Sequence, residues 1–74
     1  MIIELKINSN GNIYWYQGVE YHREDGPAII WTNGEKCWVQ NGKNHRDDGP
    51  AIIYPDGYKS WWKNGVFIKQ ELPK

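Results

Sequence analysis

The sequence contains one cysteine, Cys37, among its 74 residues, so no disulfide can form within the chain. It has no apolar run of about 18 residues, which argues against a membrane-spanning helix. It has no excess charge either, because nine basic residues balance nine acidic ones, and a general nucleic-acid binder normally carries a basic excess. A single free thiol is typical of a reducing compartment, so we expect a cytoplasmic protein that binds neither membranes nor nucleic acids.

Apolar residues recur nowhere at the 3.6-residue period of a helix over a useful length, and we therefore expect no helix. The length allows one small domain, residues 1–74. The apolar content depends on aromatic residues, with five Trp and five Tyr against one Phe and one Met. Such side chains bury a large area each and can also lie half exposed at interfaces.

The main feature of the sequence is an internal repeat of 23 residues, which places Trp15, Trp38 and Trp61 at equivalent positions. A loop of the form His-Arg-x-Asp-Gly-Pro-Ala begins at His22 and again at His45. A further step of 23 residues leads to Ile68 and Lys69 in place of His and Arg, so the last copy of the loop is incomplete. We divide the chain into repeats over about 1–22, 23–45 and 46–68, followed by a tail, 69–74, that is expected to be disordered or a single helical turn.

Each repeat predicts a β-hairpin, because β-prone residues flank Asn-Gly or Asp-Gly dipeptides that favour two-residue type I′ turns. A second turn is expected after each hairpin, marked by Asn41-Gly42 and Asn64-Gly65, whereas the first repeat has Gly18-Val19 at this place. The predicted fold is all-β: a six-stranded antiparallel meander in one flat or curled layer. The first turns of the three hairpins are predicted at Asn10-Gly11, Asn33-Gly34 and Asp56-Gly57.

A two-residue turn at Asn33-Gly34 would place Ile30 opposite Cys37 and Ile29 opposite Trp38. One face of the sheet is then predicted to carry Leu, Ile, Ala, Val and Tyr. The other is predicted to carry a row of Trp15, Trp38 and Trp61, flanked by Lys and Gln.

The segment Trp38-Val39-Gln40-Asn41-Gly42-Lys43-Asn44-His45, followed by a strand and Asp56-Gly57, resembles the MORN-type repeat, a hairpin with Trp, Asn-Gly-Lys and His. The resemblance covers nearly the whole chain and is greatest to short MORN-variant proteins of phages and bacteria. It implies an elongated sheet that serves as a binding platform, and it does not imply an enzyme.

The His-Arg loops allow two interpretations. In the structural one, Asp binds the turn, Gly26 and Gly49 supply positive φ, and each Arg pairs with a carboxylate and stacks on Trp. In the other, an anion or nucleotide binds at the loops, to His22, Arg23, His45 and Arg46. The two interpretations can be distinguished by whether the Arg side chains are already paired with Asp, as the structural one requires. We favour the structural interpretation.

No catalytic residue, metal site or cofactor is expected. Two histidines 23 residues apart match no common ligand spacing, and Cys37 fits a small packing residue better than a nucleophile.

Exposed aromatic residues and sheet edges are the remaining candidates for function. An exposed aromatic patch of Trp62, Phe67 and Tyr58 is expected near the C-terminal end. The predicted edge strands, near Ile2 to Ile7 and Trp61 to Phe67, invite homodimerisation or the addition of a strand from a target protein. The residues predicted to contact a protein partner are Trp61, Trp62, Tyr58, Phe67, Trp15 and Trp38.

These observations predict a small non-enzymatic protein-binding module. The resemblance extends this to a phage-encoded inhibitor that binds and blocks a host defence protein in the cytoplasm. The alternatives are a protein that sequesters a nucleotide signal between its His-Arg loops and a self-assembling structural repeat.

Overall fold

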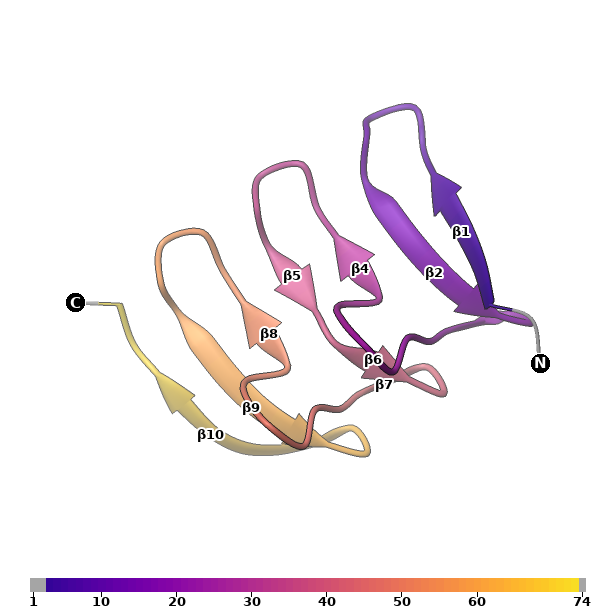
Figure 1. Ribbon diagram of the computed structural model, residues 1–74. Coiled ribbons are helices and arrows are strands. Elements are labelled where there is room, and N and C mark those ends of the chain that lie inside the picture. The colour runs from indigo at the N-terminus through magenta and orange to yellow at the C-terminus, as the bar shows by residue number, and fades with distance from the viewer. Residues whose placement is uncertain (1–2, 74) are drawn as a thin grey trace.

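A computed structural model describes residues 3–73 and shows an all-β chain with no helix in that range. Successive hairpins step along the long axis, so the two ends of the chain lie at opposite ends of the molecule (Figure 1). The principal extents are 37 × 26 × 16 Å, and the shortest of them fits one sheet with its side chains and loops. The predicted antiparallel meander is thus confirmed, and it does not close into a barrel. The described residues form no helix that could cross a membrane.

The main sheet follows the chain, in the order β1-β2-β4-β5-β8-β9-β10, with every pair antiparallel. Strand β3 pairs antiparallel with the end of β2, and β6 and β7 form a separate two-stranded sheet. The strands are β1 Ile3–Ile7, β2 Ile13–Gln17, β3 Glu20–Tyr21, β4 Ile29–Ile30, β5 Lys36–Cys37, β6 Val39–Gln40, β7 Lys43–Asn44, β8 Ile52–Ile53, β9 Lys59–Lys63 and β10 Val66–Glu71.

The prediction of type I′ turns was wrong for the first turn of each hairpin. Between β4 and β5, Trp31 N–H donates to Glu35 O at 2.9 Å and Gly34 N–H donates to Trp31 O at 3.0 Å. Gly34 has φ of 97°, whereas Asn33 is not among the residues with positive φ. This is a three-residue loop with glycine in the left-handed position, and the other two repeats have the same bonds.

The second turns are those that need two residues with positive φ. Asn41 and Gly42 have φ of 52° and 74°, and Asn64 and Gly65 have 50° and 80°. Asparagine tolerates this region better than most residues, which explains why Asn precedes Gly at both turns.

The longer first loop shifts the predicted hairpin register by one residue, and this exchanges the two faces for several side chains. Ile29, not Ile30, lies opposite Cys37. Residues that lie opposite one another on neighbouring strands share a face of the sheet. One such row of paired residues defines the side that we call the core face. That row contains Tyr14, Ile29, Cys37, Ile52 and Ser60.

The other side, the Trp face, carries Ile30, Lys36 and Ile53, together with Trp15 and Trp61. Two-residue turns would have placed Ile30 and Ile53 on the apolar side and Ile29 and Ile52 beside the Trp row. That prediction was wrong because a three-residue loop adds one residue between the paired strands.

The hydrophobic core is small and lies on the core face at the centre of the sheet. It consists of Ala28, Ile29, Cys37 and Val39, all at most 8 % exposed. The partly buried side chains of Tyr14, Tyr21, Trp31 and Ile52 pack around it. A single layer of this size buries few large side chains, so the polar bonds of the loops become important for stability.

The edge strands are β1 and β10, because β9 pairs on both sides. Ile2, at the start of the predicted first edge, lies outside the described residues. The predicted disordered or helical tail at 69–74 was wrong for residues 69–71, which continue β10, with Lys69 opposite Trp61. Pairing there satisfies the backbone groups of β9 that would otherwise form an open edge. The register shifts between Phe67 and Lys69, which marks a bulge at Ile68.

Candidate binding surfaces

Each His-Arg loop places its arginine over the tryptophan of the preceding hairpin. The Arg23 guanidinium carbon lies 3.9 Å from the centre of the Trp15 ring. Its Nε donates to Asp25 Oδ1 at 3.0 Å and its Nη1 donates to Pro27 O at 3.2 Å. The guanidinium group is therefore held by a carboxylate, a carbonyl and an aromatic ring at once.

The second loop repeats this arrangement closely. Arg46 lies 4.0 Å from the centre of the Trp38 ring, and it donates to Asp48 Oδ1 and to Pro50 O, both at 3.1 Å. Two independent copies with the same contacts show that the loop is a structural unit that the repeat supplies each time.

The loop glycines serve this arginine, and the prediction that they supply positive φ was wrong. Neither Gly26 nor Gly49 is among the residues with positive φ. A Cβ on Gly49 would lie 2.9 Å from Arg46 Cζ, and one on Gly26 would lie 2.9 Å from Arg23 Cζ. The missing side chain of each glycine therefore leaves room for the guanidinium group, which would have to shift if a Cβ were present.

Each loop histidine binds the second turn of the next repeat. His22 Nδ1 accepts the backbone N–H of Asn41 at 2.9 Å, and His45 Nδ1 accepts that of Asn64 at 3.0 Å. The neutral ring then carries its hydrogen on Nε2. These bonds join neighbouring hairpins that share little core.

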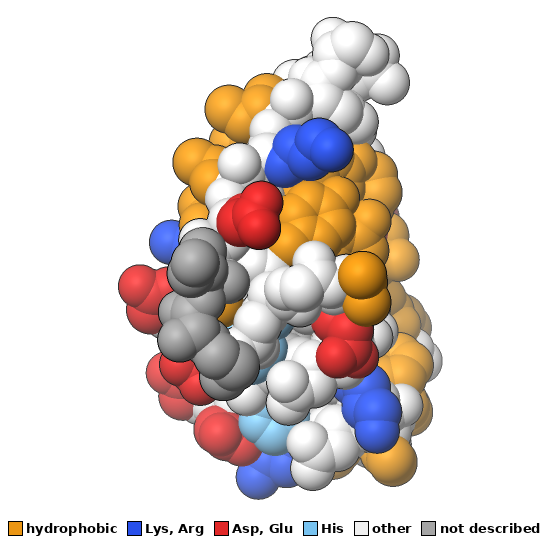
Figure 2. All heavy atoms as spheres, turned by 90° about the vertical axis from the view of Figure 1, so that its right-hand side faces the viewer, with side chains coloured by type: hydrophobic (Ala, Val, Ile, Leu, Met, Phe, Trp, Pro, Cys, Tyr) orange, Lys and Arg blue, Asp and Glu red, His pale blue; other side chains and the backbone are white. Residues whose placement is uncertain are grey.

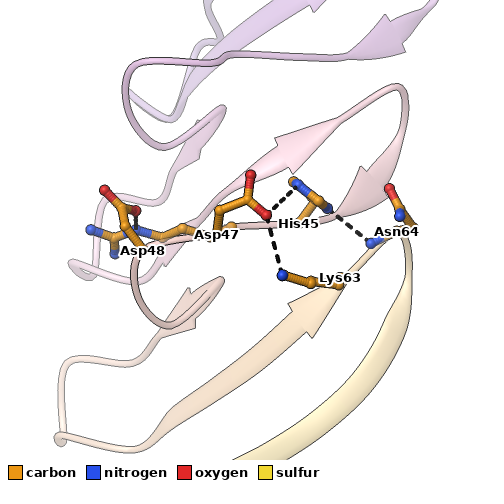
Figure 3. A network of polar contacts seen from close by, with 6 residues as sticks. His45, Asp47, Asp48, Lys63 and Asn64 are labelled. Atoms are coloured by element: carbon orange, nitrogen blue, oxygen red, sulfur yellow. Dashed lines mark hydrogen bonds and ion pairs between the residues drawn. The ribbon is translucent and has the colours of Figure 1, made fainter.

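In the second loop this contact is part of a larger polar network (Figure 3). His45 Nε2 lies 3.3 Å from Asp47 Oδ1, and Lys63 Nζ lies 3.6 Å from the same oxygen. Figure 3 shows Asp47 between His45 and Lys63, with Asn64 on the other side of the imidazole ring. The network ties the loop to both β9 and its following turn.

The arginines of the predicted anion site are thus already paired, which meets the criterion for the structural interpretation. The side chains of Arg23 and Arg46 are only 24 % and 23 % exposed. Loop residues line a shallow depression between the two loops, and these include the carboxylates Glu24, Asp25, Asp47 and Asp48. A phosphate group would meet those carboxylates and would have to displace an existing bond.

The row of Trp15, Trp38 and Trp61 is covered by cations along its length. Lys69 takes the place of the loop arginine in the third repeat, with Nζ 4.7 Å from the centre of the Trp61 ring. All three tryptophans are half-buried. Trp15 and Trp38 lie beneath the arginines of the loops, and none of the three belongs to the hydrophobic core.

The C-terminal aromatic patch forms on the core face of the β9–β10 hairpin. The rings of Trp62 and Phe67 meet edge to face, with centres 5.4 Å apart. Trp62 Nε1 donates to Ser60 Oγ at 2.9 Å, and Tyr58 Oη donates to Gln70 Oε1 at 2.7 Å. We call Tyr58, Trp62 and Phe67 the aromatic platform. Trp61 lies on the Trp face, in the row with Trp15 and Trp38 to which it was predicted to belong.

The sequence interpretation missed a second aromatic cluster near the other end of the core face. Tyr14 stacks on Tyr21 at 5.7 Å and meets Trp31 edge to face at 6.0 Å. Tyr16 completes the cluster at 5.0 Å from Tyr21. The alternation of Tyr14 and Tyr16 along one strand indicates that they share a face, but it does not predict their partners Tyr21 and Trp31, which lie outside that strand.

Cys37 is a packing residue in the core, as predicted. Burial raises the pKa of its thiol to about 11, and Sγ lies 3.7 Å from Glu35 Oε2. A thiol with such a pKa is a poor nucleophile at neutral pH. Within residues 3–73, no cluster of three or more His, Cys, Asp or Glu side chains could hold a metal ion.

Comparisons with protein-family models, with curated proteins and with solved structures found no match to this chain. The MORN-like character of the repeat therefore stays a prediction from its motifs.

Proposed function

We propose that this chain is a small non-enzymatic protein-binding module that docks its partner on the aromatic platform. The observation that carries the proposal is an exposed apolar surface around a preorganised aromatic pair. Phe67 is 47 % exposed although its ring is fixed against Trp62. Aromatic side chains held in place before binding lose little conformational entropy when a partner arrives.

Further exposed aliphatic side chains lie on β10 and beyond it, although Val66, opposite Lys63, is on the Trp face. Val66, Ile68 and Leu72 are 65 %, 52 % and 64 % exposed. A small protein rarely leaves so many large apolar side chains together at one end unless they contact something. The hydrogen bonds of Trp62 and Tyr58 are satisfied within the hairpin, so docking an apolar surface there would leave no polar group unpaired.

The charge around the platform indicates what kind of surface would fit. From residue 56 onward the sequence has four lysines and two acidic residues. Lys63 and Lys69 are exposed on the same hairpin, with their side chains on its Trp face. We infer a partner with an apolar patch bordered by carboxylates, because complementary charge favours encounter and orientation.

The narrower proposal, a phage-encoded inhibitor of a host defence protein in the cytoplasm, is supported by the resemblance of the repeat to short MORN-variant proteins. Nucleotide sequestration at His22, Arg23, His45 and Arg46 is disfavoured, since both arginines are engaged within their own loops.

The test is an affinity capture from bacterial lysate with the tagged protein, followed by mass spectrometry of both proteins and small molecules in the eluate. We expect one dominant protein that is captured by the wild type and lost with Phe67→Ala. Val19→Ala is the matched control, because Val19 is 98 % exposed in the turn between β2 and β3.

The captured protein is then purified and its affinity measured by calorimetry. A tenfold or greater loss with Phe67→Ala, while circular dichroism stays unchanged, supports docking on the platform. Equal binding by both variants, or an eluate with a nucleotide and no protein, would reject the proposed function.

A further inference from the structure

The outer side of β1 is an unpaired sheet edge at the end of the molecule opposite the aromatic platform. Among the described residues, β1 pairs with β2 alone (Figure 1). It is a regular strand of five residues with no bulge in its pairing and with neither Gly nor Pro. Edges without such protective features are available for pairing with another strand.

The hydrogen bonds of β2 show which groups of β1 point outward. Leu5 lies opposite Trp15. Trp15 uses its N–H to bond Ala28 O, and its carbonyl accepts the N–H of His22, both on the side away from β1. Leu5 therefore cannot bond to Trp15, and the alternation of an antiparallel pair turns the backbone groups of Leu5 to the open edge. The same alternation applies two residues away, at Ile3 and Ile7.

The side chains of β1 form two rows. Ile3, Leu5 and Ile7 lie on the Trp face and are 43 %, 57 % and 60 % exposed. Glu4 and Lys6 lie on the core face. Figure 2 views the molecule from this end and shows hydrophobic side chains gathered around a basic one in its upper part.

This arrangement is complementary to itself. If a second β1 lies antiparallel with Leu5 opposite Leu5, each Ile3 falls opposite an Ile7 and each Glu4 falls opposite a Lys6. The residues whose backbone groups point outward then face one another, as a hydrogen-bonded antiparallel pair requires. Both ion pairs and all aliphatic pairs form in the same register.

We propose that two copies of this chain pair through β1 in an antiparallel manner, about a two-fold axis at Leu5, to make one continuous sheet. The interface is isologous and therefore closes as a dimer. The aromatic platforms then lie at the two far ends of the joined sheet, so the dimer presents two copies of the proposed docking surface.

The other edge is a poorer partner for β1. Strand β10 has a bulge at Ile68, which opposes the addition of a strand, whereas the pairing of β1 is regular. Pairing of β1 with β10 of another copy would also produce an open filament instead of a closed dimer. The structure thus favours the symmetric β1 pair.

The charge pairs allow a test that does not depend on loss of folding. Glu4→Lys and Lys6→Glu are made separately in the full chain, and the molar mass is measured by sedimentation over a concentration series. Each change replaces both ion pairs with like-charge pairs, so we expect the dimer dissociation constant to rise about tenfold or more. An equimolar mixture of the two variants restores opposite charges across the axis, and it should form a heterodimer about as stable as the wild-type dimer.

Val66→Lys is the control, because it adds a charge at a similarly exposed residue of the other edge, and it should leave the dimer intact. Hydrogen exchange adds a second readout: the Leu5 amide should exchange faster on dilution, whereas the Lys6 amide, bonded within the sheet, should not. A wild-type chain that remains monomeric, a filament, or two variants that fail to recombine would each overturn the proposal. None of these results bears on capture by the aromatic platform, which is tested separately.

Discussion

Gly49→Ala tests the steric role of glycine in the His-Arg loop, because two physical effects predict opposite signs for the change in the free energy of unfolding. Gly49 does not have positive φ, so alanine could adopt its backbone conformation. If nothing else changed, the substitution would stabilise the protein by about 0.4–1 kcal/mol through the lower entropy of the unfolded chain. The new Cβ, however, would lie 2.9 Å from Arg46 Cζ. The arginine must then leave its place over Trp38.

The expected loss follows from the contacts that Arg46 gives up. An exposed ion pair such as that with Asp48 contributes about 0.2–1 kcal/mol, and stacking on Trp38 contributes about 0.5–1 kcal/mol. The hydrogen bond to Pro50 O adds about 0.5–1.5 kcal/mol. After the entropic gain is subtracted, we expect a net destabilisation of about 1 kcal/mol. For a domain of this size, that lowers the melting temperature by about 4–8 °C.

The assay is urea unfolding followed by Trp fluorescence for the wild type, Gly49→Ala, Arg46→Ala and the double variant. With Arg46→Ala already present, the alanine at position 49 meets no guanidinium, so it should be neutral or stabilising. Gly26→Ala should behave like Gly49→Ala, since Arg23 occupies the same place. A Gly49→Ala protein that is more stable than the wild type would refute the steric role of these glycines.

Two further predictions concern His22 and Cys37. His22→Ala removes the acceptor of the Asn41 N–H at a partly buried site, so the free energy of unfolding should fall by about 0.5–1.5 kcal/mol. The loss should be smaller for His45→Ala, because the His45 side chain is more exposed. Equal or negligible losses in thermal unfolding would contradict the role of these bonds. The pKa of Cys37 is about 11, against 9.0 without burial, so its thiolate fraction at pH 8 is about a hundredfold smaller. Iodoacetamide should therefore label the folded protein at most about one-hundredth as fast as the urea-unfolded chain. Comparable rates measured by mass spectrometry would show that the thiol is not buried.

The 23-residue repeat is sufficient to predict much of the fold. Its turn dipeptides and β-prone flanks leave few alternatives to a meander of hairpins. The stacking of Arg on Trp and its pairing with Asp were also predictable. A loop that recurs in sequence must supply the same contacts each time, and these residue types have few other ways to satisfy one another.

Register and exposure could not be predicted in this way. Asn33-Gly34 is compatible with a two-residue or a three-residue turn, and the choice depends on how β4 and β5 pair with their neighbours. One added residue moved Ile29 into the core and Ile30 to the Trp face.

The sequence by itself thus determined the class of fold, its repeats and the local bonds of each loop, because these depend on residues close together in the chain. The tertiary structure decided which face each side chain occupies and which edges remain open. It also decided that the histidine of one repeat binds the turn of the next, 19 residues away. These features depend on contacts between hairpins, and a one-residue change in register alters them all at once.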